Sequence, residues 1–292
     1  MGRSWSAVVP VYNEIELMRR TLPSWFKCNP SELILAVDDP TPEGVEETFW
    51  LIAEKYPSVD GRIVKVKKSP EWKFHQANVR RTAFKKAKND IILTGDIDLV
   101  LFKRPILKAI NLVGKNNIGL VSLNKFRFPH SVSEFMFTLN EQLLRKLLHG
   151  IFDRVMTTTT FTGLYAFYRP YWLETEKEEE IKKLVNPKQV LRGELFREQE
   201  ISNVVGEDTF LRDAMQTKYR CVYLRDVGAI DLRTGLENLK YIQYHKGAYF
   251  ACKGRKLITA LGRAVLRFQP YYLIGYLDKK RGVFRGDKLI EN

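Results

Sequence analysis

The residues Ile91-Ile92-Leu93-Thr94-Gly95-Asp96-Ile97-Asp98 form an apolar run that ends in two acidic residues, spaced one residue apart. The run has the character of a strand buried in a parallel sheet, and open α/β sheets bind ligands where such strands end. Carboxylates at positions i and i+2 of an extended segment point the same way. They suit Mg²⁺ or Mn²⁺ bridging a diphosphate, although Asp is also a common residue for ending strands and opening turns.

Strand-like and helix-like segments alternate through the first 125 residues. The apolar patterns predict short strands over residues 6–11, 33–37, 63–66 and 91–94, and helices through Leu17, Leu22 and Trp25 and over residues 43–54, 78–88 and 106–113. Such alternation is typical of βαβ units around a parallel sheet. The expected fold class is therefore α/β, with a mostly parallel, Rossmann-like sheet flanked by helices.

The second half of the chain has a more mixed pattern. We expect strands over residues 161–168 and 221–224, and helices over residues 174–184, 207–215 and 236–253. The helix over residues 174–184 carries Glu and Lys four residues apart, so it is predicted to be a solvated face without chemistry. This half is expected to be smaller and mixed in strand direction.

Composition limits the classes of protein that fit. The 292 residues are 45% hydrophobic, which is ordinary for a globular protein of one large or two fused domains. The apolar stretches are far shorter than the ~20 residues that span a bilayer, and the N-terminal residues lack a signal-peptide pattern, so a cytoplasmic location is expected. Three scattered cysteines, Cys28, Cys221 and Cys252, fit neither a disulfide framework nor a zinc motif.

The net charge of +14 favours an anionic partner: nucleic acid, a membrane surface or a phosphorylated substrate. From Lys253 to Arg285 there are nine Lys or Arg against one acidic residue, Asp278, so more than half of the excess lies in that stretch. There Ile258, Leu261, Val265 and Phe268 recur at helical spacing among basic residues, which predicts a basic amphipathic tail over residues 253–292. Such a tail suits peripheral contact with the inner face of an anionic cell membrane, or a helix docked on the rest of the chain with its basic face in water.

Acidic and amide residues follow four of the predicted strands or loops in a fixed order. The segments are Val9-Pro10-Val11-Tyr12-Asn13-Glu14, Val37-Asp38-Asp39, Asp96-Ile97-Asp98 and Gly206-Glu207-Asp208. This ordered set resembles family 2 glycosyltransferases of the GT-A fold, over roughly residues 5 to 250. The resemblance implies a GT-A domain over residues 1–252, with a nucleotide-binding half (1–125), an acceptor half (126–252) and the tail (253–292) beyond it.

The resemblance also assigns roles in binding the donor, a sugar linked to UDP or GDP. It implies that the turn with Pro10, Tyr12, Asn13 and Glu14 holds the base and ribose together with Asp38, while Asp39 caps the loop; the two aspartates could exchange roles. Arg80, in a segment that echoes the family pattern ahead of the D-x-D strand, would stack on the base or reach a phosphate. His75, in a predicted loop, could cover the nucleotide or simply be exposed.

For the metal and the reaction, the resemblance implies that Asp98 binds Mn²⁺ or Mg²⁺ and that Asp96 contacts the ribose or a metal-bound water. Family members typically invert the anomeric centre, so one base takes the proton of the acceptor hydroxyl. Asp208 is the candidate base and Glu207 the alternative, although acidic residues also favour the first turn of a helix. Many relatives carry a His where this chain has residues 228–234; Asp231 could complete the metal shell instead, or Arg233 could neutralise the diphosphate.

The acceptor wall is expected at residues 157–163, with Thr162 and Gly163 as candidate acceptor residues. A glycan or a polyprenyl phosphate is the expected acceptor. Two other classes remain open: a sugar-phosphate nucleotidylyltransferase, which would need a Gly-rich, Arg-containing loop where this chain has residues 12–14, and a basic nucleic-acid-binding module, which would have no need for the acidic strand ends.

Overall fold

The structure, a computed structural model, describes residues 3–72, 75–127, 163–183, 207–232, 244, 247, 248, 251, 256–266 and 270–283. These residues divide into two compact units. The first contains the described residues up to 126 together with residues 163–183 and 207–232, and the second contains the described residues from 244 to 283. Within the described residues, no helix has the length and apolar character needed to cross a membrane.

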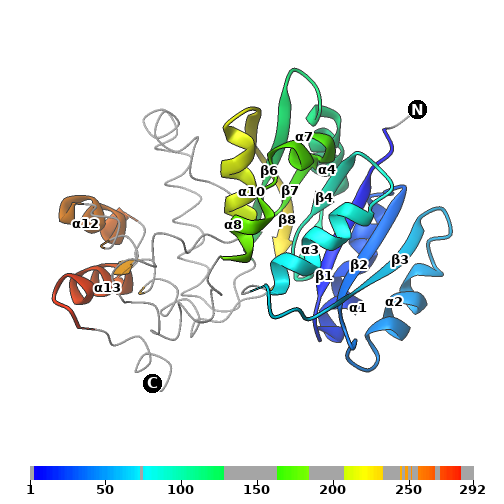
Figure 1. The fold of residues 1–292 in the computed structure, drawn as a ribbon, viewed down its shortest axis with the longest axis horizontal. Coiled ribbons are helices and arrows are strands. Elements are labelled where there is room, and N and C mark those ends of the chain that lie inside the picture. The colour runs from blue at the N-terminus through cyan, green and yellow to red at the C-terminus, as the bar shows by residue number, and fades with distance from the viewer. Residues whose placement is uncertain are drawn as a thin grey trace. The chain divides into compact units, whose positions relative to one another are not determined.

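The first unit is built on an eight-stranded sheet with the order β3-β2-β1-β4-β7-β6-β8-β5 (Figure 1). Four neighbouring strands are parallel, as the sequence predicts: β1 (Ser6–Val11), β2 (Glu32–Asp39), β3 (Asp60–Lys67) and β4 (Ile91–Thr94). The helices α1 (Ile15–Lys27), α2 (Val45–Ala53) and α3 (His75–Lys86) connect them. The α/β fold class is therefore confirmed for this half.

The other half of the sheet is antiparallel where its pairing is defined. Strand β7 (Tyr165–Tyr168) runs against β4 and against β6 (Ile118–Arg127), and β5 (Leu99–Leu101) runs against β8 (Arg220–Asp231). The sequence analysis missed β5 and β6, and its strand over residues 221–224 was too short. Strand β8 continues to Asp231 because its last residues pair with β5, a long-range contact that local patterns do not encode.

Two apolar layers enclose the sheet. On one face, α1, α2 and α4 (Lys103–Leu112) contribute buried side chains such as Trp25, Phe49 and Ile106; on the other, α3, α7 (Arg169–Thr175) and α10 (Glu207–Gln216) contribute Phe84, Trp172 and others. Alternate residues of β1 enter opposite layers, as the two-residue period of a strand requires. The sheet is thereby buried on both faces, which holds its strand ends rigid.

The prediction of a single charged helix over residues 174–184 is wrong. The chain forms α7, which ends at Thr175, and a separate short helix, α8 (Glu178–Lys182). The break occurs at Glu176, whose backbone is extended and whose buried carboxylate accepts a hydrogen bond from the Arg81 guanidinium. A buried, charge-assisted bond of this kind outweighs the helix propensity of a glutamate.

In the second unit, α12 (Leu257–Leu266) and α13 (Pro270–Lys280) pack together. Buried Ala260 of α12 meets Tyr272 and Tyr276 of α13 in a small apolar cluster that also contains Ala251. Both helices fall within residues 253–292, and the assignment of that stretch as a basic amphipathic tail stays a prediction. The predicted segments over residues 157–162 and most of 236–253 lie outside the described residues, as do Arg233 and Cys252.

Candidate active site

The parallel register brings the predicted acidic and amide residues to one edge of the sheet. Val11 stands opposite Val37 in β2, and Val8 opposite Thr94 in β4, so β1, β2 and β4 all end on the same side. The turn over residues 12–14, the pair Asp38-Asp39 and the D-x-D residues therefore follow neighbouring strand ends. This is the edge at which α/β sheets bind ligands.

The turn after β1 is held by its own glutamate. Glu14 Oε2 accepts hydrogen bonds from the backbone N–H groups of Tyr12 (2.8 Å) and Asn13 (3.0 Å). Glu14 also precedes the first residue of α1, where a negative charge complements the helix dipole. Pro10 lies on β1 opposite Ala36, and the Tyr12 side chain is 64% exposed. The carboxylate thus shapes the turn and leaves an aromatic ring at the surface.

At the end of β2, Asp38 lies beside a histidine. His75 Nε2 is 3.1 Å from Asp38 Oδ1, a contact distance, although the geometry is not that of a hydrogen bond. The backbone of Asp38 is tied down by Thr41, whose hydroxyl donates to the Asp38 carbonyl oxygen (2.9 Å). The prediction of a loop position for His75 is wrong, because His75 is the first residue of α3. Asp39 is the last residue of β2.

Arg80 of α3 binds the first aspartate of the D-x-D. Its Nη2 donates a hydrogen bond to Asp96 Oδ1, and its own side chain is only 4% exposed, whereas that of Asp96 is 35% exposed. A buried guanidinium is expensive unless it is paired in this way. The pairing was missed by the sequence analysis, which expected Arg80 to contact the nucleotide. The sole local signal for it was the position of Arg80 on a helix packed beneath the D-x-D strand.

Three polar side chains of α1 hold the segment that follows Asp96. The Thr21 hydroxyl lies 2.6 Å from the carbonyl oxygen of Ile97, and Trp25 Nε1 donates to the carbonyl of Leu99 (3.0 Å). Ser24 Oγ accepts the backbone N–H of Leu101 (2.9 Å). Helix α1 therefore holds the backbone from Ile97, between the two aspartates, to Leu101. Sequence reasoning treated α1 as an apolar element and missed these contacts.

Strand pairing brings the backbones of Asp98 and Asp231 close together. Asp231 stands opposite Leu99, and the N–H of Leu232 donates to the carbonyl oxygen of Asp98 (2.8 Å). Both aspartates are only 4% exposed. Lys125 Nζ lies 2.9 Å from Asp231 Oδ2, and this lysine was another residue that the sequence analysis did not identify. A lysine at the end of a strand gives no local signal of such a partner.

Gly163 adjoins the same edge. It precedes β7, whose first residue, Tyr165, stands opposite Thr94, and a Cβ built on Gly95 would meet the Gly163 carbonyl oxygen at 3.4 Å. The same Cβ would stand 2.9 Å from Leu99 Cδ1, so Gly95 allows the chain to pass tightly before Asp96. Gly163 has a φ of 72°, a conformation that favours glycine. Thr162 lies outside the described residues.

Glu207 and Asp208 begin α10, as the sequence predicts for the helix, but their side chains lie outside what the structure describes. The helix is anchored further along by buried Leu211 and Met215. The assignment of Asp208 as base, with Glu207 as the alternative, stays a prediction.

The donor set fits a hard divalent cation. Mg²⁺ and Mn²⁺ take carboxylate oxygens, and one or two carboxylates suffice when substrate phosphates supply further ligands. Asp96 and Asp98 provide two, on a turn that is fixed by α1, and Asp231 adjoins Asp98. Among the residues that the structure describes, no group of three or more His, Cys, Asp or Glu side chains is already gathered as a metal site.

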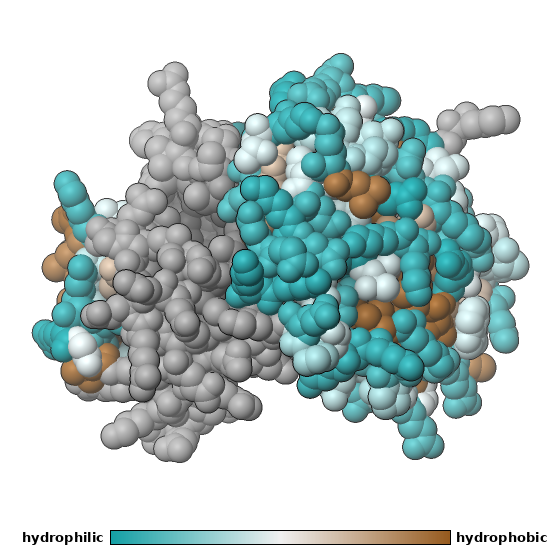
Figure 2. Space-filling model, in the orientation of Figure 1, coloured by the Kyte–Doolittle hydropathy of each residue, from teal (hydrophilic) through white to brown (hydrophobic). Residues whose placement is uncertain are grey.

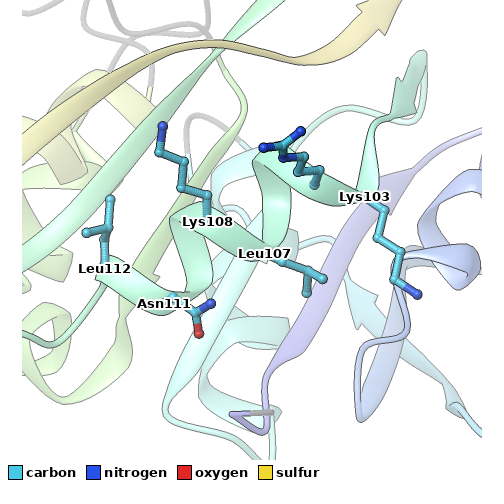
Figure 3. A pocket seen from close by; sticks show the side chains of 6 residues that line it. Lys103, Leu107, Lys108, Asn111 and Leu112 are labelled. Atoms are coloured by element: carbon cyan, nitrogen blue, oxygen red, sulfur yellow. The ribbon is translucent and has the colours of Figure 1, made fainter.

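A shallow hollow of about 670 Å³ lies elsewhere, over the outer face of α4 (Figure 3). Its described lining comes from α4 alone: Lys103, Arg104, Leu107, Lys108, Asn111 and Leu112. It contains none of the acidic residues at the sheet edge, so it is not part of the candidate active site.

Comparison with known proteins agrees with this geometry. The model of the family described as "Glycosyl transferase family 2" matches residues 6–175. This match covers more than half of the chain and contains β1, β2 and β4 with the acidic residues at their ends. The chain belongs to glycosyl transferase family 2.

Solved structures share the fold. A mannosyltransferase from Pyrobaculum calidifontis, in complex with GDP-Man and Mn²⁺, is 17% identical with a TM-score of 0.56, covering 100% of this chain and 73% of that one. TarS of S. aureus is 14% identical with a TM-score of 0.50, covering 85% of this chain and 42% of that one. The architecture is thus the GT-A fold that the sequence predicts. No curated protein matches the sequence closely enough to count as a relative.

Proposed function

We propose that the protein is a metal-dependent glycosyltransferase that moves a sugar from a nucleoside diphosphate to an acceptor, with inversion at the anomeric carbon. The observation that carries this proposal is the pair of carboxylates that follows β4. Asp96 is held by buried Arg80, and Asp98 is buried where its backbone meets the end of β8. Burying carboxylates at a strand edge costs desolvation, which a bound cation would help to offset.

The donor would lie across the ends of β1 and β2. In the proposed complex Asp38 accepts a hydrogen bond from the base, and the turn over residues 10–14 supports the ribose, with Asp39 capping the loop. His75, 3.1 Å from Asp38, would flank the base. The complex of the Pyrobaculum mannosyltransferase with GDP-Man and Mn²⁺ supports a sugar linked to GDP or, by the same chemistry, to UDP.

Asp98 would hold Mn²⁺ or Mg²⁺, with Asp96 contacting the ribose or a metal-bound water and Asp231 completing the shell. A bound cation stabilises, as a Lewis acid, the charge that develops on the leaving diphosphate. Arg80 keeps Asp96 in place for that role. Lys125 neutralises Asp231 until the donor arrives, and it then becomes a cation within reach of the diphosphate. Arg233 is a second candidate for the same task.

The chemical step needs one proton acceptor. Asp208, or alternatively Glu207, takes the proton of an acceptor hydroxyl as the acceptor oxygen forms a bond to the anomeric carbon. The bond from that carbon to the diphosphate oxygen breaks, and its electron pair leaves with the nucleoside diphosphate. Thr162 and Gly163 would form the acceptor wall; Gly163 adjoins Gly95, directly before Asp96. The proposed acceptor is a glycan or a polyprenyl phosphate.

A thermal-shift panel with UDP, GDP, ADP and CMP, each with and without Mn²⁺, tests the proposal. One nucleoside diphosphate should raise the melting temperature only with Mn²⁺, and Asp98→Ala should lose this response. Asp226→Ala is the matched control, because Asp226 lies on the same strand as Asp231 but pairs with Lys108 at the surface. If no nucleotide shifts the wild-type protein, the transferase proposal is wrong.

A further inference from the structure

Helix α12 presents two faces of different character. Ala260 and Ala264 are buried on its inner face, and Ala260 belongs to the cluster with Tyr272 and Tyr276 of α13. The backbones of α13 and the neighbouring segment approach so closely that a Cβ on Gly275 would meet the Tyr244 carbonyl oxygen at 1.9 Å. The inner face of this helical pair is therefore already occupied by tight packing of small residues.

The large aliphatic residues of α12 lie on the other face. Leu257, Ile258, Leu261 and Val265, here called the aliphatic stripe, are all exposed, Ile258 by 70% and Val265 by 63%. At 3.6 residues per turn they fall within about 100° of arc. An ordinary amphipathic helix of a globular protein has the opposite arrangement, with its large apolar residues inward. A contiguous exposed stripe of this kind marks an interaction surface.

The exposed charge of the described parts of α12, α13 and their flanking residues is of one sign. Lys256, Lys280 and Arg281 are exposed, and Figure 2 shows hydrophilic and hydrophobic side chains together over the region of α12 and α13. Within residues 256–266 and 270–283 the one acidic residue is Asp278, which is buried and accepts a hydrogen bond from the Tyr244 hydroxyl (3.2 Å). The exposed charge of the described α12–α13 pair is therefore cationic.

We propose that the aliphatic stripe of α12 docks into the interface of an anionic phospholipid bilayer. Ten helical residues extend about 15 Å, half the thickness of the hydrocarbon core, so α12 would lie in the plane of the membrane with the stripe among the acyl chains. The cations would meet lipid phosphates. A second copy of the chain is the less favourable occupant, because it would bring two cationic surfaces together. This inference does not depend on the sugar-transfer chemistry.

Flotation of the full-length chain with vesicles tests the proposal. Wild type should float with vesicles of phosphatidylglycerol and phosphatidylcholine, and not with phosphatidylcholine alone, and 1 M NaCl should weaken binding because it screens charges beyond about 3 Å. The double variant Ile258→Ser/Val265→Ser should bind at least about tenfold more weakly, since it removes two buried aliphatic groups from the lipid phase.

The matched control is Leu51→Ser/Leu173→Ser, which alters two exposed leucines of the first unit and should float like wild type. Circular dichroism on all variants checks that they remain folded, and the exposed positions predict unchanged melting. Equal flotation of the stripe variant and wild type, or no flotation of wild type, overturns the proposal. So does light scattering that shows a wild-type dimer and a monomeric stripe variant, because the stripe would then join two copies.

Discussion

Thr21→Val tests the contribution of one α1 side chain to the turn that we propose binds the metal. Valine keeps the shape and β-branching of threonine, so the substitution removes the hydroxyl without opening a cavity. What is lost is the buried contact of the hydroxyl to the carbonyl oxygen of Ile97 (2.6 Å), between the two aspartates, together with its contact to the Leu17 carbonyl oxygen of its own helix (2.7 Å). Removing one partner of a buried hydrogen bond costs about 1–3 kcal/mol, and this is the expected drop in the free energy of unfolding.

The same substitution should also lower the affinity for Mn²⁺. If about 1 kcal/mol of the loss loosens the Asp96–Asp98 turn, Mn²⁺ binding in the presence of the nucleoside diphosphate should weaken about fivefold. Urea denaturation measures the first quantity and Mn²⁺ titration by electron paramagnetic resonance the second. Thr175→Val is the control, because the Thr175 hydroxyl bonds only carbonyls of its own helix at 3.2 Å, and it should change stability by no more than about 0.5 kcal/mol. Equal effects of the two substitutions would refute the argument that Thr21 holds the turn.

Three further outcomes are expected. Lys125→Met should weaken nucleoside diphosphate binding at saturating Mn²⁺ about tenfold, because it removes a cation that we propose contacts the diphosphate. Lys108→Met alters a surface ion pair and should leave this affinity unchanged in the same calorimetric titration. Asp208→Asn should reduce the rate of transfer to a hydroxyl acceptor by ~10²–10⁴ but spare transfer to a phosphate acceptor, because a phosphate is already deprotonated above pH ~6. If a radiolabelled-sugar assay shows equal losses with both acceptors, Asp208 is not the base. Burial raises the pKa of the Cys28 and Cys221 thiols to about 12, so neither should react readily with a thiol reagent at pH 8 until urea unfolds the protein. Rapid labelling of the folded chain at either cysteine, located by mass spectrometry, would contradict the packing.

The parallel half of the fold could be predicted because its information is local. Strand and helix patterns alternate from residue 6 to residue 112, and each acidic motif follows its own strand, so the order of the motifs sets their place on one edge. β5 and β6 could not be predicted in the same way. β5 is only three residues long, and its pairing with β8 joins segments more than a hundred residues apart.

The candidate site also has a part that local sequence patterns predict and a part that they do not. The positions of Asp38, Asp96 and Asp98 could be predicted from the ends of strands, but the side chains that pair with the aspartates could not. Arg80 and Lys125 are ordinary basic residues in the sequence, and their roles depend on which carboxylate the fold places within reach. A sequence with a net charge of +14 offers many such cations, so tertiary structure was needed to select these two.

The reaction product tests the central proposal most directly. Incubation of the full-length protein with UDP- and GDP-linked sugars, Mn²⁺ and a glycan or polyprenyl phosphate acceptor should release a nucleoside diphosphate, as followed by ion-exchange chromatography. The proposal predicts that Asp98→Asn abolishes this release and that Asp226→Asn does not. Conversion of the nucleotide sugar and added pyrophosphate into a nucleoside triphosphate and a sugar 1-phosphate, in a parallel incubation without acceptor, would indicate a nucleotidylyltransferase instead. Release unaffected by Asp98→Asn would contradict the proposed metal site at the end of β4.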